Sequence, residues 1–372
     1  MSRHGIPIGR IFGISIDLDL SWFLIVGLLT WSLAVSYFPA QFPGWPASEY
    51  WALGFISAIL LFASVLVHEL AHSVVAGHFG LFVPRITLFL FGGVSQLATE
   101  PPSAAAEFWI SVVGPLTSFA LAAFFWELEP LLAASQPLIA LASYLALLNL
   151  VLAVFNLIPG FPLDGGRIFR AAVWRFTNSY HQATVSAGIS GRFFGFLLIF
   201  YGVWRALTGN IIDGVWIAII GWFLESAAGS QLQQETLRRL LGGHKVADAM
   251  QRNFPVCGGE DSIEHLAVGI LQPLRSRFAI VTENGVLTGI VTMAAIREIP
   301  REKWPATTVA QIMIPLQRMA NIEPNAPLWS ALEKMGRDGV NQLPVLQAGG
   351  VVGVLSRDDI VHYLGEVQTL SA

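Results

Sequence analysis

Long apolar stretches dominate residues 1–230, whereas residues 231–372 mix short apolar and polar runs. A bilayer core of about 30 Å needs about 20 apolar helical residues to cross it. Six stretches are of roughly this length, and they cover residues 20–38, 51–77, 104–126, 137–158, 190–207 and 211–228. The pattern predicts a polytopic α-helical membrane domain over residues 1–230, with about six spans.

Two segments interrupt the apolar pattern of this first part. Residues 82–98, FVPRITLFLFGGVSQLA, are rich in β-branched and aromatic residues and contain Pro84 and a glycine pair, which favours a β-hairpin or a small sheet. Residues 156–167, NLIPGFPLDGGR, hold two prolines and three glycines, which end the fourth span. Neither segment is expected to cross the bilayer.

The second part begins with an amphipathic stretch, residues 231–243, that ends at a glycine pair and is predicted to be a linker helix. An internal repeat fills residues 244–372. VADAM at 246–250 matches VAQIM at 309–313, and LTGIV at 287–291 matches VVGVL at 351–355. Strand-like and helix-like runs follow one another in each copy. We therefore expect an α+β module of two repeats, about 244–300 and 307–366.

Composition and charge support this division. The chain is 54% hydrophobic and 12% charged, against about 25% charged residues in an ordinary soluble domain. Residues 1–230 carry 19 charged side chains, and residues 231–372 carry 27, so a wholly soluble protein is excluded. The single cysteine, Cys257, excludes a disulfide scaffold. The net charge of −4 provides no basic surface for nucleic acid.

Arginine placement predicts the orientation in the membrane. The first span lacks a small-residue cleavage site, so we expect an uncleaved anchor. Six spans put both termini on one side, and the connections on the opposite side, near 39–50, 127–136 and 208–210, contain no Lys or Arg. Most arginines fall on the side of the termini, with Arg205 as the exception. The positive-inside rule then places the termini and the repeat module in the cytoplasm. We therefore expect a multi-pass protein of the plasma membrane.

The second span contains the sequence SVLVHELAHSVVAGH. His68 and His72 are four residues apart, so they share one face of a helix and can hold one metal ion. Glu69 is placed to take a proton from a metal-bound water. A charged side chain at bilayer depth costs at least about 2.5–3.5 kcal/mol, which disfavours a chance occurrence and favours a zinc ion as the neutralising partner.

A catalytic zinc ion usually takes three protein ligands, so one more is required. His78 follows His72 by six residues, which turns it off the ligand face of the helix. Asp164 is the better candidate, because it is an acidic residue in the broken segment at the end of an apolar span. The alternative without a function is an aspartate that only forms a turn before Gly165. The residues alone do not decide whether Asp164 is a metal ligand or a turn residue.

The two motifs together resemble the site-2 protease family of intramembrane zinc metalloproteases. That family carries H-E-x-x-H on one span and N-x-x-P-x-x-x-x-D-G on a later one, and this chain matches the second pattern at Asn156, Pro159, Asp164 and Gly165. The segments FGGV and GPLTSF resemble the family less specifically. Some members of that family insert a PDZ domain between the two motifs. In this chain a hairpin and two spans fill the interval between His72 and Asp164, which leaves no room for such a domain.

The resemblance implies a role for each matching residue. It makes His68, His72 and Asp164 the zinc ligands, Glu69 the general base, and Asn156 a contact to the substrate backbone or the oxyanion. The implied activity is regulated intramembrane proteolysis of membrane-anchored proteins, with the Glu69-activated, zinc-bound water as nucleophile. The segment 82–98 would either hold an extended substrate strand at its edge or only plug the membrane face.

The repeats resemble a tandem cystathionine-β-synthase (CBS) pair, a module that often binds adenine nucleotides. The family's ribose-binding pattern is G-x-x-S/T-x-x-D. The second repeat matches it at Gly353, Ser356 and Asp359, whereas the first has Ala295 in place of the acid. The resemblance implies at most one complete nucleotide site. The alternatives are a structural module or one that joins two copies of the chain into a homodimer.

A rival interpretation from another functional class is a CBS-regulated transporter or channel without protease activity. Such a protein would also join membrane spans to this module, but it would not need His68, Glu69, His72 and Asp164 together. Zinc content and a cleavage assay discriminate between the two.

Overall fold

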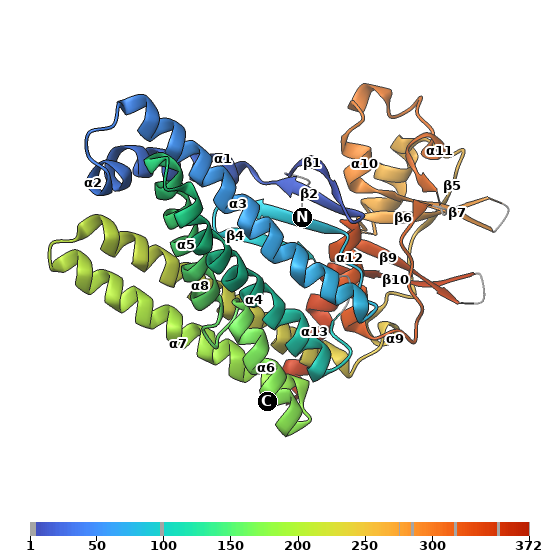
Figure 1. Ribbon diagram of the computed structural model, residues 1–372. Coiled ribbons are helices and arrows are strands. Elements are labelled where there is room, and N and C mark those ends of the chain that lie inside the picture. Colours follow the sequence, from blue (N-terminus) through green and yellow to red (C-terminus); the bar gives the residue numbers. More distant parts are fainter. Residues whose placement is uncertain are drawn as a thin grey trace. The chain divides into compact units, whose positions relative to one another are not determined.

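The computed structural model describes residues 5–96, 100–274, 276–283, 286–315, 318–347 and 350–371. The chain divides into two compact units, Ser2–Glu235 and Thr236–Ala372, and each is described by itself (Figure 1).

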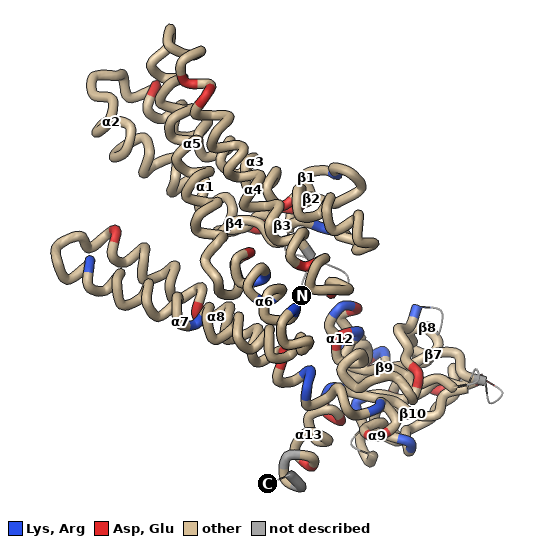
Figure 2. Tube along the Cα trace, turned by 60° about the horizontal axis from the view of Figure 1, so that its bottom comes forward, with Lys and Arg blue, Asp and Glu red and all other residues tan. Residues whose placement is uncertain are grey.

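Six helices of the described residues are long and apolar enough to cross a membrane, as the sequence predicted. They cover Leu20–Gln41, Ala47–His78, Ala104–Leu132, Gln136–Asn156, Tyr180–Leu207 and Ile211–Gly242. Their elements are α1 (Leu20–Ser32), a π-helical turn (Leu33–Tyr37), α2 (Phe38–Gln41), α3 (Ala47–His78), α4 (Ala104–Leu128) with a 3-10 turn (Glu129–Leu132), α5 (Gln136–Asn156), α7 (Tyr180–Leu207) and α8 (Ile211–Gly242). Charged residues are sparse along these helices and frequent in the second unit (Figure 2).

Two helix boundaries differ from expectation. The fifth span begins at Tyr180 rather than near residue 190, because the Ser179 side chain accepts a hydrogen bond from the Gln182 amide and caps the helix there. The expected linker helix 231–243 is the last part of α8, which runs without interruption to Gly242. A further helix, α6 (Asp164–Thr177), follows the broken segment and was not predicted as a separate element.

The helices of the membrane unit pack closely through small residues. α3 contacts α1, α4 and α5, and α6 contacts α4 and α7 (Figure 1). A Cβ added at Gly202 of α7 or Gly214 of α8 would meet the backbone of the other helix. Small residues let apolar helices approach in this way, and packing rather than burial from water drives helix association in a membrane.

A four-stranded sheet accompanies the helices. Its strands are β1 (Ile6–Ile11), β2 (Ile14–Leu18), β3 (Arg85–Phe89) and β4 (Gly92–Gln96), in the order β1-β2-β3-β4. β3 and β4 form the hairpin predicted for residues 82–98, of which residues 97–98 lie outside the described residues. β2 pairs with β3 in parallel, which makes the hairpin part of a larger sheet.

Strands β1 and β2 are an element that the sequence analysis does not predict. Ile14, Ile16 and Leu18 alternate along β2 and are buried, as a strand with one covered face requires. Asp17 between them is buried too, and its carboxylate lies 2.9 Å from the Arg85 guanidinium. The sheet therefore joins residues 6–18 to the segment that follows the second span.

The second unit is the expected α+β module. Its first part contains α9 (Val246–Ala249), β5 (Val256–Gly258), β6 (Phe278–Glu283), β7 (Val286–Thr292), α10 (Met293–Arg297), α11 (Val309–Ile312) and β8 (Ile314–Pro315). Its second part contains α12 (Leu328–Asp338), β9 (Gln342–Gln347), β10 (Gly350–Ser356) and α13 (Arg357–Ser371). Each part has a core of its own, around Ile263, Leu266 and Ile296 in one and Leu328, Met335 and Leu343 in the other.

Candidate metal centre

Three donor atoms meet between α3 and α6. His68 and His72 lie on one face of α3 and are 3% and 7% exposed. Asp164 is the first residue of α6 and faces them. The His68 Nε2 and His72 Nε2 atoms are 3.1 Å apart, and the Asp164 Oδ2 atom lies 3.0 Å from the first and 3.3 Å from the second. The three atoms form a compact triangle.

This triangle fits a single tetrahedral zinc ion. Zinc–nitrogen and zinc–oxygen bonds of about 2.0–2.1 Å place two ligand atoms about 3.3 Å apart in a tetrahedron, and the separations of 3.0–3.3 Å agree with this value. Two imidazoles and one carboxylate are also the donor types of a catalytic zinc site, which leaves a fourth position free. The residues present therefore fit the metal.

Both imidazoles are oriented by α4. The His72 Nδ1–H donates to the Ile110 carbonyl over 2.6 Å, so the neutral ring carries its lone pair on Nε2, toward Asp164. The His68 Nδ1 atom is hydrogen-bonded to the Ser118 hydroxyl at 2.8 Å. Outer partners of this kind fix the ring orientation of metal-binding histidines.

Glycines allow the elements to come this close. A Cβ added at Gly114 of α4 would overlap the Nε2 atoms of both His68 and His72. A Cβ at Gly165 or Gly166 of α6 would overlap the backbone of the preceding segment, at residues 157–158 and 160–161. The sequence Asp-Gly-Gly thus lets the chain fold back on the first turn of α6 and carry the Asp164 carboxylate to the histidines.

A cavity of about 320 Å³ opens beside the triangle. Its lining includes the three donor residues together with Glu69, which is half-buried, and Asn156 at the end of α5. The structure thus brings together all five residues that the sequence assigned to this site. β4 forms part of the wall, and a Cβ added at Gly93 would meet the Glu69 side chain.

Four further residues near the cavity had no role in the sequence interpretation. Gly114 and Ser118 lie in the segment GPLTSF, which was noted only for its resemblance. Glu107 and Arg170 form a buried ion pair between α4 and α6. A sequence signal did exist for Glu107, because it is an acid close to the start of an apolar span, where an unpaired charge is costly.

The residues expected to bind a nucleotide lie near the end of β10. Ser356 and Asp359 line a cavity of about 390 Å³ in the second unit. The Asp359 carboxylate accepts hydrogen bonds from the Ser356 amide at 2.7 Å, from the Ser356 hydroxyl at 2.6 Å and from the Gln251 side-chain amide at 2.6 Å. A Cβ at Gly353 would approach the Met250 sulfur, so this glycine permits close packing of the chain around residue 250.

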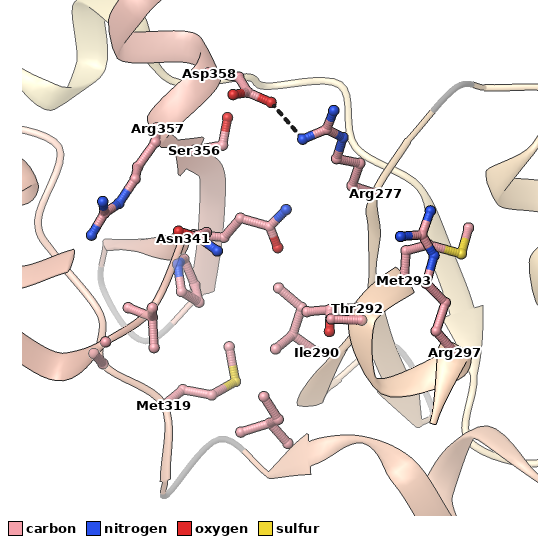
Figure 3. Close-up of a pocket in the computed structure, with 17 residues that line it drawn as sticks. Arg277, Ile290, Thr292, Met293, Arg297, Met319, Asn341, Ser356, Arg357 and Asp358 are labelled. Atoms are coloured by element: carbon pink, nitrogen blue, oxygen red, sulfur yellow. Dashed lines mark ion pairs between the residues drawn. The ribbon is translucent and has the colours of Figure 1, made fainter. Parts of the chain in front are cut away.

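A larger cavity of about 680 Å³ lies between the two repeats. Figure 3 shows its side chains, with Thr292 and Arg297 from the first repeat and Asn341, Ser356 and Arg357 from the second. An ion pair of 3.1 Å between Arg277 and Asp358 stands at its rim. Thr292 caps α10 by accepting a hydrogen bond from the Ala295 amide at 3.3 Å.

Models of two known families match the chain. A model described as Peptidase family M50 matches residues 56–129 and 129–200. A model of the CBS domain matches residues 246–302 and 309–366.

Similar proteins cover nearly the whole chain. "Putative zinc metalloprotease Rip3" of Mycobacterium tuberculosis is 37% identical over 97% of this chain and 93% of its own length. "Putative zinc metalloprotease sll0528" of Synechocystis is 34% identical over 97% of this chain and 96% of its own length. A solved structure of the site-2 protease from Methanocaldococcus jannaschii is 29% identical, covers 61% of this chain and 95% of that chain, and gives a TM-score of 0.45.

Six candidate spans together with the His68, His72 and Asp164 cluster define a polytopic membrane protein of the metallopeptidase class. With relatives at this identity and coverage, the chain belongs to peptidase family M50, the site-2 protease type of zinc metalloprotease, and it carries two CBS domains after the membrane unit.

Proposed function

We propose that the chain is an intramembrane zinc endopeptidase that cleaves membrane-spanning proteins in regulated intramembrane proteolysis. The observation that carries the proposal is the triangle of His68 Nε2, His72 Nε2 and Asp164 Oδ2, with sides of 3.0–3.3 Å. These three side chains would hold the zinc ion. When bound there, zinc supplies a Lewis acid that acidifies water and polarises the scissile carbonyl.

The remaining side chains of the cavity would move the proton and hold the substrate. Glu69 accepts a proton from the attacking water at its carboxylate and later delivers it to the leaving amine. Asn156 donates from its side-chain amide to the substrate backbone or to the developing oxyanion. Their presence in one cavity with the three donor residues supports these roles.

Strand β4 would hold the substrate in an extended form. A helical segment cannot be cut as it stands, because its carbonyls are bonded within the helix, so it must unwind locally. β4 is an edge strand of the four-stranded sheet, and its residues Gly92 to Ser95 line the cavity with Glu69. Addition of the unwound segment to this edge would satisfy its backbone and favours substrate binding over the alternative that the sheet only plugs the membrane face.

We infer the orientation from the charge pattern. The far ends of the spans carry few basic groups, and the exception, Arg205, lies 3.8 Å from Asp213 of α8, which partly balances its charge. The inference places both termini and the CBS pair in the cytoplasm and the spans in the plasma membrane. Water and substrate would then reach the cavity from the cytoplasmic side, past the irregular segment before Asp164, because irregular backbone at membrane depth must line such a cavity.

The CBS pair would regulate the protease by binding an adenine nucleotide. Ser356 and Asp359 line the cavity of about 390 Å³, and the Asp359 carboxylate could exchange its bond with Gln251 for a bond with the ribose. Gly353 would contribute only by allowing close packing nearby. A role in joining two copies of the chain is the alternative for this module.

Zinc content and cleavage measured on the same preparations test the proposed function. The full chain is purified in detergent, its zinc is measured, and a helical membrane substrate is incubated with wild type and with Glu69→Gln. We expect one zinc per chain in both and cleavage only by wild type. Membrane proteomics of cells with either form would then identify substrates. A wild-type chain without zinc, or without any cleaved membrane protein, would favour a CBS-regulated transporter or channel instead.

A further inference from the structure

One buried ion pair joins the two helices that build the metal centre. Glu107 of α4 is 1% exposed and Arg170 of α6 is 8% exposed. The Arg170 Nε–H donates to the Glu107 Oε1 atom over 2.7 Å, and the Arg170 Nη2 group donates to the same oxygen. A buried ion pair contributes little net stability compared with apolar packing in its place. The pair therefore matters here because it fixes the position of α6 against α4.

The Arg170 guanidinium also holds the segment that leads to Asp164. It lies over the Phe161 ring at 4.9 Å and over the Tyr180 ring at 4.8 Å. Phe161 is buried, and its amide donates to the Ala187 carbonyl of α7 over 3.2 Å. Three residues after Phe161 the chain reaches Asp164, so a shift of this ring would move the carboxylate.

Glu107 belongs to the face of α4 that orients the histidines. Glu107, Ile110, Gly114 and Ser118 follow one another at spacings of three or four residues, which puts them along one side of the helix. Ile110 and Ser118 hold the two imidazoles, and Gly114 leaves room for them. One face of α4 therefore holds the two histidines of α3 in place and, through the pair of Glu107 with Arg170, also contacts the helix that carries Asp164.

We propose that Arg170, held by Glu107 and stacked on Phe161, is a positioning residue that fixes Asp164 against the two histidines. It would act through α6 and the segment before it, and it would not contact the reacting atoms. The proposal rests on the proposed zinc site, and it adds two residues on which metal retention depends. Arg170 also lines the cavity, so a direct contact with substrate is the competing role that the experiment must separate.

The experiment measures zinc retention by the full chain in detergent, apart from any cleavage. Zinc released from each variant is followed with a chromophoric chelator, and the visible spectrum of the cobalt-loaded protein reports the ligand geometry. The variants are Arg170→Lys, which removes the planar guanidinium, Glu107→Gln, which removes the anchor, and Phe161→Leu, which removes only the ring. Arg192→Lys is the matched control, because Arg192 pairs with Glu225 at 2.8 Å and lies 5.8 Å from the Phe196 ring, away from the cavity lining.

Loss of an outer partner that bonds a ligand typically weakens metal binding about 10- to 100-fold. Because these three residues act on Asp164 indirectly, we expect a loss near the lower end, about 10-fold, with an altered cobalt spectrum and no change in the control. The double variant Glu107→Gln with Arg170→Met leaves no unpaired buried charge, so it tests a purely structural role. We expect the double variant to retain zinc as weakly as the single variants do, because the stacking on Phe161 is still missing.

Zinc retention within two-fold of wild type in the variants, or full recovery in the double variant, would overturn the proposal. A change in cleavage with unchanged zinc retention would assign Arg170 to substrate binding and would overturn it equally. A wild-type chain that binds no zinc would refute the proposed function, and the positioning role would fall with it. Phe161→Leu keeps the charged pair intact, so it remains informative where a charge variant does not fold.

Discussion

Replacement of Gly114 by alanine tests whether the metal centre depends on the closeness of α4 and α3. The added methyl group would overlap the Nε2 atoms of both His68 and His72. Neither ring can turn aside freely, because His72 donates to the Ile110 carbonyl and His68 is hydrogen-bonded to Ser118. At least one of these bonds must therefore break or lengthen.

Two opposing contributions set the stability of this variant. A hydrogen bond of this kind contributes about 0.5–1.5 kcal/mol, and a buried polar group that is left without a partner costs about 1–3 kcal/mol. Alanine in a helix interior gains about 1 kcal/mol over glycine. We therefore expect a modest net loss of stability of roughly 0–2 kcal/mol. The effect on the metal should be larger, about 10- to 100-fold in zinc affinity, because the orientation of a ligand is lost.

The assay compares zinc affinity, by competition with a chelator, with the thermal unfolding of the metal-free chain. Gly77→Ala is the control, because Gly77 lies in the same helix as the histidines and an added Cβ there meets nothing within 4 Å. We expect the control to bind zinc as wild type does. If Gly114→Ala binds zinc with wild-type affinity, the two imidazoles do not occupy the positions described and α4 does not set their place.

Three further predictions concern single residues. Asp164→Ala should lower zinc occupancy and cleavage together, as measured by metal analysis and a substrate assay, and wild-type zinc with normal turnover would remove it from the site. Burial and then the Asp261 charge raise the pKa of the Cys257 thiol to about 11. At pH 8 an alkylating reagent should therefore react with the Cys257 thiol of the native chain about 200-fold more slowly than with a free thiol of pKa about 8.5. The folding stability that this thiol contributes should be lost as the pH rises from about 8.5 toward 11. Reaction of the native chain as fast as in denaturant would contradict this. Asp359→Ala should weaken adenine nucleotide binding to the full chain about 10- to 100-fold in calorimetry, since a charged acceptor contributes about 1.5–3 kcal/mol, and no binding of ATP or AMP at millimolar concentration by wild type would refute the sensor role.

The parts of the fold that follow from local patterns could be predicted from the sequence. The six apolar stretches are six helices in the structure. The length of an apolar run decides whether a helix can cross the bilayer, and a helix satisfies its own backbone hydrogen bonds there. The pair His68 and His72 followed from helical spacing alone. Asp164 was a candidate from its place in the broken segment, and the family resemblance made it the third ligand. Its position beside the histidines depends on how α6 folds back across Gly165 and Gly166, and no periodicity along the chain encodes that contact.

Strand β2 illustrates a different limit. Its alternation of Ile14, Ile16 and Leu18 is visible in the sequence, but the strand is short. It pairs with its neighbour β1 and with β3, and β3 follows only after the first two spans. The buried Asp17 further weakens the apolar pattern, and its ion pair with Arg85 accounts for its burial. Side chains whose charge is balanced by a distant partner look like exceptions to the pattern until that partner is known.

The small sheet also forms part of the wall of the cavity. Hydrolysis inside a membrane needs a polar space, and every polar group that faces it must be held by the protein rather than by lipid. Groups from four elements line the cavity: Glu69 on α3, Asp164 on α6, Asn156 at the end of α5, and residues of the edge strand β4. None of these groups could be left in contact with hydrocarbon without a cost. The irregular segment before α6 and the small sheet are therefore the parts of this helical membrane protein that would make the proposed hydrolytic site possible.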